Sequence, residues 1–360
     1  MTDNNKTRIV VGLSGGVDSS AAASLLVEQG YDVVGITLKV WPQDCVSRAE
    51  DKCCGPQAVM DARSVADKLD IPYYLVDESK EFQRDVIDYF AAEYKAGRTP
   101  NPCVMCNEKL KFGNLIDRAR KLGAEYVATG HYARLEQRDG RTVLLRGRDA
   151  RKDQTYFLFS LGQEQLAHMM FPLGELQKSE TREVARCVNL KTAEKQESQE
   201  ICFVPDKDYK KFLTTARLVE EHRGEIVDTR GQVLGHHDGI EFYTIGQRKG
   251  LGISSPTPLY VIELDPENNR VVVGGEELLL RDEFRIDRCN WIAFDHLAKP
   301  IEASAAIRYN HPGTEATVIP GENGQATVKL REPQRAVTPG QACVFYQDDL
   351  VVGGGWIMRN

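Results

Sequence analysis

Short apolar runs alternate with segments of helical spacing along the first 130 residues, and this alternation constrains the fold more than any other feature. The expected strands are 8–13, 31–40, 71–77 and 124–131, and the expected helices are 18–29, 55–70, 80–97 and 110–123. Near-continuous apolar strands that alternate with helices indicate a parallel sheet covered on both faces. Ligands of such sheets bind at the carboxyl ends of the strands, where the strand order reverses.

The composition changes along the rest of the chain. Residues 151–221 have mostly helical spacing, whereas from residue 222 short alternating segments separated by Gly, Pro, Asn and Asp indicate strands and hairpins. We therefore predict an α/β domain over 1–221, a small β-rich domain over 222–280 and a β-barrel over 281–360. The last segment holds about six expected strands, which are enough to close a small barrel.

The stretch SGGVDSS, residues 14–20, lies between the first expected strand and the first expected helix. A glycine turn at a helix N-terminus binds anions through backbone N–H groups and the helix dipole. Asp18, Ser19 and Ser20 are of the residue types that cap helices. The loop has no lysine and matches neither G-x-x-x-x-G-K-[ST] nor G-x-G-x-x-G. A tight strand–helix turn without a ligand is the alternative interpretation.

The stretch GRTPNPCVMCNEKLKFG, residues 97–113, is the second informative segment. Because Pro100 and Pro102 disfavour a helix interior, we expect a loop over 97–105 and a helix that starts near Cys106. A thiol at a helix N-terminus gains from the helix dipole, which predicts a lowered pKa for Cys106.

Cys103 and Cys106 form a C-x-x-C pair for which three interpretations stay open. The spacing can be accidental. It can belong to a zinc site, although no second C-x-x-C or histidine pair completes one. It can also hold a redox-active or sulfur-carrying thiol that works with Cys202, which its neighbours alone would place in the core.

Charge and cysteine content restrict the class of protein. The 360-residue chain has a formal net charge of −7, which argues against indiscriminate nucleic-acid binding but allows a local basic face. Nine cysteines favour thiols over a disulfide scaffold, and we expect Cys187, Cys289 and Cys343 in the core. The polar N-terminal MTDNNKTR and the lack of a long apolar run predict a cytoplasmic protein without a membrane span.

SGGVDSS resembles the PP-loop of ATP pyrophosphatases, which cut ATP between the α and β phosphates and cradle the leaving diphosphate. Further motifs, in order along residues 8 to 358, are similar to those of the tRNA-specific 2-thiouridylases: GRTPNPCVMCN, ATGHYAR, KDQTYFL, EICFVPDKDYKKFL, FYTIGQRKGLGI and TPGQACVFY. The resemblance implies an enzyme that uses ATP and Mg²⁺ to adenylate the C2 oxygen of the wobble uridine, U34, and then replaces that oxygen with sulfur.

The resemblance also implies roles for single residues. Cys106 matches the nucleophile and Cys202 the persulfide carrier, and the two form a disulfide as sulfur is released. The implied ATP-binding residues are Gly12, Leu13, Ser14, Gly15, Gly16, Val17, Asp18, Ser19, Leu38 and Gly130. The implied tRNA-binding residues are Asn101, Pro102 and Cys103, at positions that contact the target base, and His131, Lys152, Asp153, Gln154, Arg308, Tyr309 and Gln341. The implied partners are a tRNA anticodon stem-loop and a persulfide donor, such as a cysteine desulfurase or a sulfur-relay protein.

Cys103 departs from the family pattern, because many members carry an aspartate there as the expected acid/base. Either another group does that work or the site differs. Cys103, Cys106 and Cys202 would together offer three thiolates, a set that a [4Fe–4S] cluster with an open fourth position can use. Both interpretations stay open. Cys45, Cys53 and Cys54 are interpreted as incidental.

Two alternative functions remain at this stage. Another PP-loop adenylating enzyme, such as an amidotransferase-type synthetase, needs an ammonia source, and no glutaminase segment is evident. A non-catalytic, ATP-gated RNA-binding protein would leave the cysteine pair with a structural role only.

Overall fold

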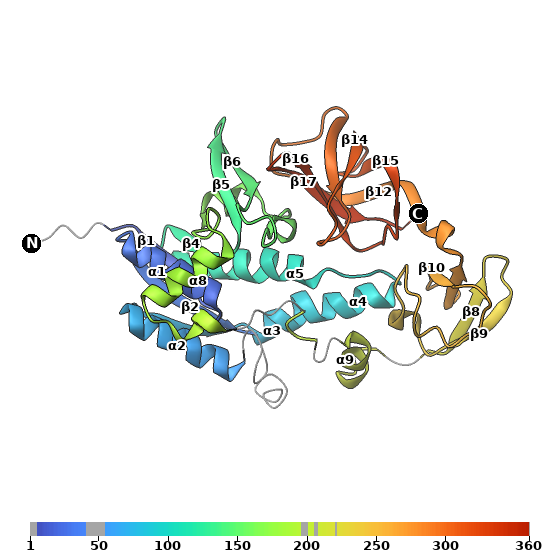
Figure 1. Cartoon of the computed structure of the whole chain (residues 1–360), viewed down its shortest axis with the longest axis horizontal. Coiled ribbons are helices and arrows are strands. Elements are labelled where there is room, and N and C mark those ends of the chain that lie inside the picture. The colour runs from blue at the N-terminus through green and yellow to red at the C-terminus, as the bar shows by residue number, and fades with distance from the viewer. Residues whose placement is uncertain (1–5, 41–54, 196–200, 205–207, 220–221, 360) are drawn as a thin grey trace, which may run out of the picture. The chain divides into compact units, whose positions relative to one another are not determined.

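The computed structural model describes residues 6–40, 55–195, 201–204, 208–219 and 222–359 (Figure 1). It divides into two compact units. The first holds Met1–Val86, Cys103–Lys207 and Asp349–Val351, and the second holds Ile87–Pro102, Asp208–Asp348 and Val352–Asn360. Cys45, Cys53 and Cys54 lie outside the described residues.

A parallel sheet forms the centre of the first unit, with its described strands in the order β3-β2-β1-β4-β7. The strands are β1 (Arg8–Gly12), β2 (Asp32–Lys39), β3 (Tyr73–Asp77), β4 (Tyr126–Ala128) and β7 (Met169–Met170). The apolar runs predicted the first four. They did not predict β7, because two residues at the edge of a sheet are too few to show a pattern.

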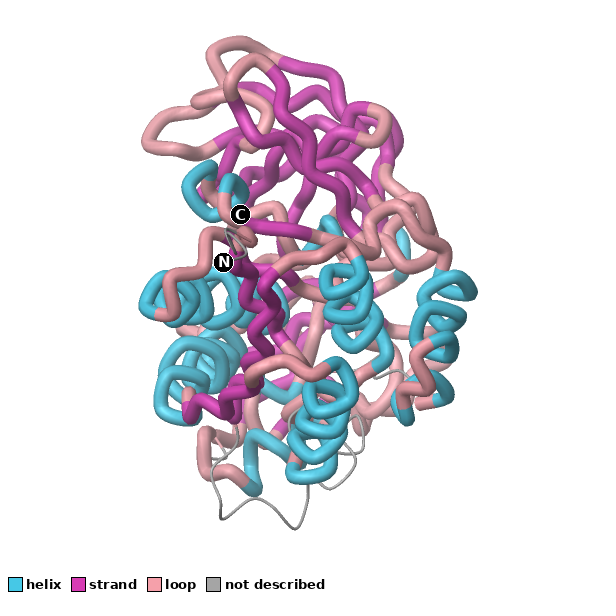
Figure 2. Tube along the Cα trace, turned by 90° about the vertical axis from the view of Figure 1, so that its left-hand side faces the viewer, coloured by secondary structure: helices cyan, strands magenta, loops and turns pink. Residues whose placement is uncertain are grey.

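Helices cover both faces of this sheet, and Figure 2 shows them on either side of the strands. On one face, Ile9, Val11 and Leu13 pack with α1 (Val17–Glu28), α2 (Pro56–Leu69), α8 (Lys178–Cys187) and the 3₁₀ turn η5 (Lys191–Glu194). On the other face, α6 (Leu115–Lys121) brings Leu115 against Gly12. Since successive strand residues point to opposite faces, a strand covered on both faces has a continuous apolar run, as Ile9, Val10 and Val11 form in β1.

The remaining helical segments are more broken than expected. The helix predicted over 80–97 consists of α3 (Ser79–Phe82), the π-helical η2 (Gln83–Asp88) and α4 (Tyr89–Lys95). The prediction of mostly helix over 151–221 is wrong for the first part, which holds only the short η4 (Thr155–Phe157) and α7 (Gln163–Ala167) before β7. Gly162, Pro172 and Gly174 interrupt the helical spacing there. The antiparallel hairpin β5 (Ala133–Arg138) and β6 (Arg141–Arg146) was not predicted.

The second unit contains two β structures, the helix α4 and the short helix α9 (Tyr209–Thr215). One is a sheet in the order β10-β11-β8-β9: β10 (Tyr260–Asp265), β11 (Arg270–Gly274), β8 (Gly224–Asp228) and β9 (Val233–His237). The 3₁₀ turn η7 (Ile240–Phe242) lies between β9 and β10, and η8 (Glu276–Leu279) follows β11 and leads into β12 (Leu280–Trp291).

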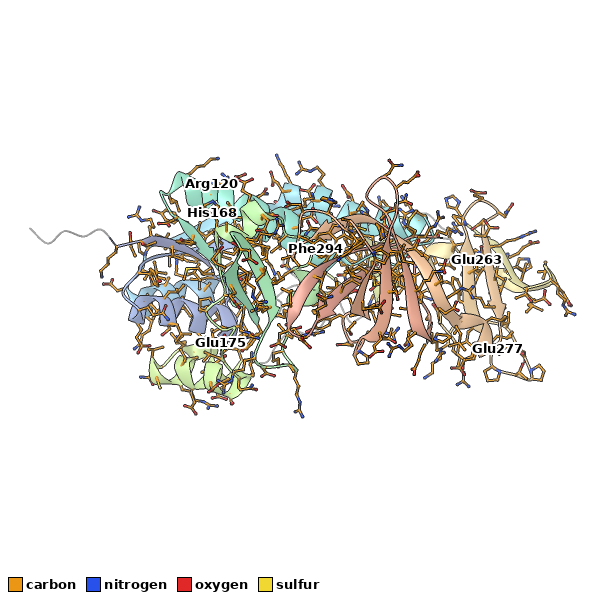
Figure 3. The ribbon with its side chains drawn as sticks, turned by 90° about the horizontal axis from the view of Figure 1, so that it is seen from above. Arg120, His168, Glu175, Glu263, Glu277 and Phe294 are labelled. Carbon is orange, nitrogen blue, oxygen red and sulfur yellow. The ribbon has the colours of Figure 1, made fainter. Side chains whose placement is uncertain are left out.

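The other β structure is the closed barrel predicted near the C-terminal end of the sequence. Its strands are β12 (Leu280–Trp291), β13 (Ile301–Ala306), β14 (Thr314–Pro320), β15 (Ala326–Arg335), β16 (Ala342–Gln347) and β17 (Leu350–Ile357), and pairing of β12 with β17 closes it. Phe284, Ile286 and Phe345 fill its interior. The ring of Phe294, labelled in Figure 3, stacks on Trp291 at a centroid distance of 5.4 Å.

The three cysteines expected in the core have different environments. Cys343 is fully buried and Cys289 packs against the barrel core, so burial raises the pKa of both thiols, that of Cys289 to about 12. The prediction for Cys187 is wrong, because it ends α8 on the exposed side of the helix. Among the described residues, no helix is both long and apolar enough to cross a membrane.

Candidate active site

The turn between β1 and α1 lies at the carboxyl edge of the parallel sheet, beside the point where the strand order reverses. The backbone N–H of Leu13 donates to the carbonyl of Ile36 at 2.8 Å. The hydroxyl of Thr37 donates to the carbonyl of Leu13 at 2.7 Å. The hydroxyl of Ser19 accepts from the backbone N–H of Ser14 at 3.1 Å. Strand β2 and the first turn of α1 therefore both fix the glycine turn.

Gly15 and Gly16 have different reasons to be glycine. Gly15 has φ +69°, and a Cβ there would lie 2.2 Å from the carbonyl oxygen of Ala58. Gly16 is extended, with φ −99°, and a Cβ there would meet only the hydroxyl oxygen of Ser14, at 3.5 Å, among the described atoms. The fold thus requires glycine at 15 but leaves space beside 16, where an anion at the start of α1 would lie.

The helix α1 begins without a side-chain cap. Its N-cap is Gly16, so the prediction that Asp18, Ser19 or Ser20 caps the helix is wrong. The hydroxyls of Ser19 and Ser20 instead donate back to the carbonyl of Gly16, at 3.2 and 2.8 Å. The N–H groups of the first turn have no intrahelical acceptor, and these groups bind anions in other helices of this kind.

Gly130, in the segment after β4, completes the edge of the loop. A Cβ at Gly130 would lie 2.6 Å from the backbone nitrogen of Ser19 and from the carbonyl carbon of Asp18, so only glycine permits this approach. Leu38 is half-buried near the carboxyl end of β2. The residues predicted to bind ATP therefore lie at the end of β1, in the turn, at the start of α1 and beside the carboxyl ends of β2 and β4.

Two lysines that were not predicted from the sequence as site residues contact this loop. The Lys178 ammonium lies 2.6 Å from the Asp18 carboxylate, which also accepts from the Tyr132 hydroxyl at 2.9 Å. The Lys195 ammonium donates to the carbonyl of Gly15 at 3.0 Å and pairs with Asp61 at 2.6 Å. The sequence held one signal for them, since a phosphate loop without its own lysine needs positive charge from elsewhere.

Both cysteines of the pair lie within a helix, and this helix starts before Cys106. Helix α5 (Pro102–Met105) begins with the proline and continues without a break into the π-helical η3 (Cys106–Asn114) and then α6. The prediction of a loop over 97–105 is therefore wrong for residues 102–105. Proline is well tolerated at the first helical position, because its missing N–H would have no helical acceptor there. Cys103 lies in the first turn and Cys106 in the second, where the dipole argument made for Cys106 is weak.

Cys106 and Cys202 are both half-buried. Phe203, next to Cys202, packs its ring on Phe82 of α3 at 5.7 Å, and α3 also contacts η3, which starts at Cys106. The side chain of Asn107 ties η3 to the carbonyl of Phe157 at 3.1 Å. The two cysteine segments therefore pack against the same short helix, and a meeting of the two sulfur atoms stays a prediction.

The thiols do not meet the requirement for a metal or cluster site. Among the described residues, no group of three or more His, Cys, Asp or Glu side chains is placed to hold a metal ion. A [4Fe–4S] cluster at Cys103, Cys106 and Cys202 would need three thiolates around one point. The arrangement of the described side chains does not fit that group.

The predicted tRNA-binding residues of the first unit are largely engaged inside it. His131 is 8% exposed, shares a hydrogen bond of 2.8 Å with the Thr129 hydroxyl, and contacts the rings of Phe112 and Phe171, which also contact each other. Burial, and then the charge of Lys111, hold the pKa of His131 well below its ordinary value.

The Lys152–Gln154 motif is partly buried as well. Asp153 accepts from the backbone N–H of Gly147 and from the Thr155 hydroxyl, and burial raises its pKa. The side chain of Gln154 accepts from the backbone N–H of Tyr132 at 3.1 Å. Lys152 is half-buried.

The predicted tRNA-binding residues of the second unit divide into exposed and buried groups. Arg308 and Tyr309 are exposed just after β13. Asn101 is 7% exposed, and Pro102 is buried beside it. Gln341 donates through its side-chain nitrogen to the carbonyl oxygens of Thr99 and Pro100, both at 3.0 Å.

Family models match the chain in three consecutive segments. Their descriptions are "tRNA methyl transferase HUP domain" for residues 7–206, "tRNA methyl transferase PRC-barrel domain" for 210–275 and "Aminomethyltransferase beta-barrel domain" for 281–357. The fold and site thus define a PP-loop ATP-utilising enzyme of the HUP class, followed by two β domains.

Curated relatives identify the family. The tRNA-specific 2-thiouridylase MnmA of Clostridium perfringens is 50% identical over 98% of both chains. Those of Geobacter metallireducens and Moorella thermoacetica are both 51% identical, over 99% and 97% of this chain and 98% of their own. The chain belongs to the tRNA-specific 2-thiouridylase family. Each of these relatives matches across all three segments, whereas each segment model covers one domain.

Solved structures add little. A 4-thiouridine synthetase in complex with RNA and ATP is 18% identical, with a TM-score of 0.34 over 59% of this chain and 50% of that chain. The NMN synthetase of Francisella tularensis is 19% identical, with a TM-score of 0.33 over 54% of this chain and 66% of that chain. At these TM-scores the similarity is too low to support a conclusion about this chain.

Proposed function

We propose that this protein uses ATP and Mg²⁺ to replace the C2 oxygen of the wobble uridine, U34, of tRNA with sulfur. The observation that carries the proposal is the glycine turn at the carboxyl edge of the sheet, with space beside Gly16, in a chain 50% identical to a 2-thiouridylase over nearly its full length. Gly12 to Ser19 would hold the phosphates, and Leu38 and Gly130 would flank the adenosine. Mg²⁺, when bound, supplies charge neutralisation to the phosphates.

Adenylation prepares the uridine for substitution. The C2 oxygen attacks the α phosphorus of ATP, the bond from that phosphorus to the bridging oxygen breaks, and diphosphate leaves. Backbone N–H groups at the start of α1 favour this step, because negative charge accumulates on the departing diphosphate. The C2 oxygen then leaves the ring as part of AMP.

Cys106 and Cys202 would deliver the sulfur. A donor transfers one sulfur atom to Cys202 as a persulfide. In one route the terminal sulfur attacks C2 directly, AMP leaves, and the Cys106 thiolate breaks the S–S bond by attacking the Cys202 sulfur. In the other, Cys106 attacks first and the released sulfide attacks C2. Both routes leave a Cys106–Cys202 disulfide, which a dithiol reductant returns to two thiols. The proposed scheme uses these two thiols and no iron–sulfur cluster.

The tRNA would present its anticodon stem-loop with U34 turned out of the stack. The residues proposed to contact the base are Asn101, Pro102 and Cys103. The residues proposed to support tRNA binding are His131, Lys152–Gln154, Arg308, Tyr309 and Gln341. Some of these residues would act indirectly, by holding the backbone of neighbouring segments in place. The proposed domain boundaries follow residues 221 and 280. The proposed partner is a persulfide donor in the cytoplasm.

Thiolation of a U34-containing tRNA transcript tests the proposal. Cys106→Ser and Cys202→Ser are expected to abolish 2-thiouridine formation while ATP and tRNA binding remain. Cys187→Ser is the matched control, because this exposed cysteine ends α8 outside the site and its loss leaves thiolation unchanged. Full thiolation by both site variants would refute the sulfur-transfer role and return the chain to the adenylating or RNA-binding alternatives.

A further inference from the structure

The nucleotide loop of this chain has to bind a highly charged diphosphate without a lysine of its own. P-loops of the other common type carry a lysine inside the loop for this purpose. Backbone N–H groups and the dipole of α1 supply only partial charges. Asp18, in the first turn of α1, adds a negative charge at the same place. Beside the bound Mg²⁺, a cation from another part of the chain that offsets Asp18 would therefore favour diphosphate binding.

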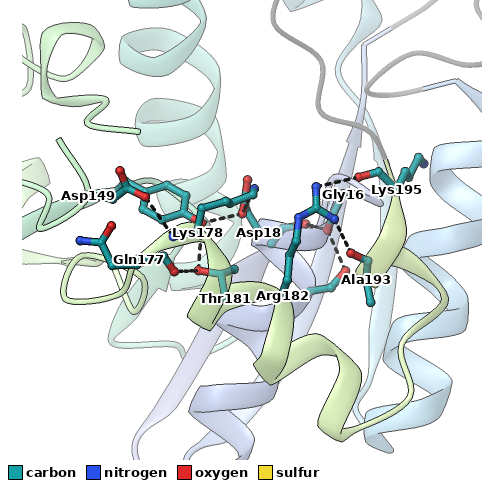
Figure 4. A network of polar contacts seen from close by, with 12 residues as sticks. Gly16, Asp18, Asp149, Gln177, Lys178, Thr181, Arg182, Ala193 and Lys195 are labelled. Atoms are coloured by element: carbon teal, nitrogen blue, oxygen red, sulfur yellow. Dashed lines mark hydrogen bonds and ion pairs between the residues drawn. The ribbon is translucent and has the colours of Figure 1, made fainter. Parts of the chain in front are cut away.

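One segment, from Lys178 at the start of α8 to Lys195 directly after η5, brings two ammonium groups to this loop, and Figure 4 shows Lys178 beside Asp18. Lys178 reaches Asp18, on the helix side of the turn, at 2.6 Å. Lys195 reaches the carbonyl of Gly15, on the strand side of the turn, at 3.0 Å. The two lysines thus bracket residues 15–18, the part of the turn with space for an anion.

Both lysines are held in place by contacts of their own. The backbone N–H of Lys178 donates to the buried Asp149 at 3.0 Å, and its ammonium lies 5.7 Å from the centre of the Tyr132 ring. Its side chain is only 13% exposed. A lysine ordered this way loses little further side-chain freedom when a ligand binds.

Lys195 is fixed from two directions. Arg182 of α8 donates to the carbonyl oxygens of Ala193 and Lys195, which orders the end of η5. Asp61 of α2 then pairs with the Lys195 ammonium at 2.6 Å. Helix α2 also touches the loop through Ala58, next to Gly15. The ammonium is therefore anchored at the loop carbonyl by two helices.

We propose that Lys178 and Lys195, from a distant segment, are positioning residues that make the nucleotide site receptive to the diphosphate. Lys178 offsets the negative charge of Asp18, which would otherwise repel the diphosphate, and Lys195, paired with Asp61, holds the carbonyl of Gly15. This inference rests on the proposed ATP site. It predicts a role that depends on the β and γ phosphates and not on the adenosine or the α phosphate.

Binding of three ligands to the full chain, in the presence of Mg²⁺, tests the inference: ATP, inorganic diphosphate and AMP. Lys178→Met and Lys195→Met are expected to weaken ATP and diphosphate binding by about tenfold each, and AMP binding by less than about twofold. Lys195→Arg keeps the charge and should recover most of the loss. Lys191→Met, at an exposed lysine of η5, is the control and should bind all three ligands as wild type does.

Each outcome decides between the roles. Equal weakening of AMP and diphosphate would mean that the lysines only support the fold, and unchanged diphosphate binding would remove them from the site; either result overturns the inference. Thermal unfolding of each variant identifies one that fails to fold, and the other lysine and the arginine variant then carry the test. A wild-type protein that binds neither ATP nor diphosphate would instead refute the proposed ATP site.

Discussion

The side-chain nitrogen of Gln341 lies 3.0 Å from the carbonyl oxygen of Pro100, across 241 positions of the sequence. The same nitrogen donates to the carbonyl of Thr99, also at 3.0 Å, so both of its N–H groups are used. The backbone N–H of Thr99 donates to the carbonyl of Pro339 at 2.8 Å. The segment before β16 thus holds the backbone that leads into Asn101, and Gln341 is expected to act through that backbone.

Gln341→Glu is expected to lower kcat for thiolation about tenfold and to leave KM for tRNA within about twofold. A carboxylate opposite two carbonyl oxygens loses both hydrogen bonds and repels the loop, at a cost of about 1–3 kcal/mol. Steady-state kinetics with tRNA as the varied substrate measure both constants, and ATP affinity should not change.

Gln347→Glu is the matched control for this prediction. Gln347 ends β16 and donates to the carbonyl of Glu302, away from residues 99–102. Its variant should keep wild-type kcat. A Gln341→Glu enzyme with unchanged kcat and a raised KM for tRNA would instead indicate direct contact between Gln341 and the tRNA.

Replacement of the two loop glycines by alanine should separate folding from ligand binding. Gly15→Ala is expected to destabilise the protein by at least about 2 kcal/mol, because its left-handed φ and the Ala58 carbonyl 2.2 Å away both disfavour a Cβ. Gly16→Ala fits the fold and should unfold within about 0.5 kcal/mol of wild type, yet bind ATP more weakly by about tenfold. Urea unfolding and ATP titration give the two numbers. A Gly16→Ala protein with wild-type ATP affinity would place the phosphates elsewhere.

The sequence predicted most of what positions this site. Four strands of the parallel sheet and the glycine turn follow from local patterns, because an apolar strand buried on both faces and a turn before a helix are encoded within a few residues. The closed barrel followed from hairpin composition. Short elements such as β7 and the hairpin β5–β6 were missed, since their residues show no period of their own.

Long-range contacts were the part that local patterns did not reach. Lys178 and Lys195 approach the loop only because α8 packs beside α1, and nothing near either lysine in the sequence predicts its partner. The prediction that a helix starts near Cys106 was wrong for a local reason. Pro102 was interpreted as a residue outside the helix, whereas it is the first residue of the helix.

Cys103→Asp is expected to keep thiolation activity within about threefold of wild type. Many family members carry an aspartate at this position, and the described side chains form no metal-holding group that would require a thiol there. Thiolation assays under aerobic and anaerobic conditions should agree for both proteins. Cys106→Ser is the comparison, because it removes the proposed nucleophile from the same helix. Loss of activity in Cys103→Asp, together with iron and sulfide in the anaerobically purified wild type, would contradict the cluster-free scheme.

The buried imidazole of His131 should make stability depend on pH. Its pKa is well below the ordinary value because of burial, whereas in the unfolded chain it titrates near 6.5. Below that pH the unfolded state binds a proton that the folded state does not, so the free energy of unfolding falls as pH drops from about 6.5 towards the folded pKa. Burial also lowers the pKa of His237 and His311, which add to the same trend.

His131→Gln keeps a polar partner for Thr129 and should lose less stability than wild type between about pH 7.5 and pH 5, measured by urea unfolding at each pH. His296→Gln, at an exposed position, should follow the wild-type curve. Equal losses in His131→Gln and wild type would show that His131 takes up its proton without leaving its site beside Phe112 and Phe171.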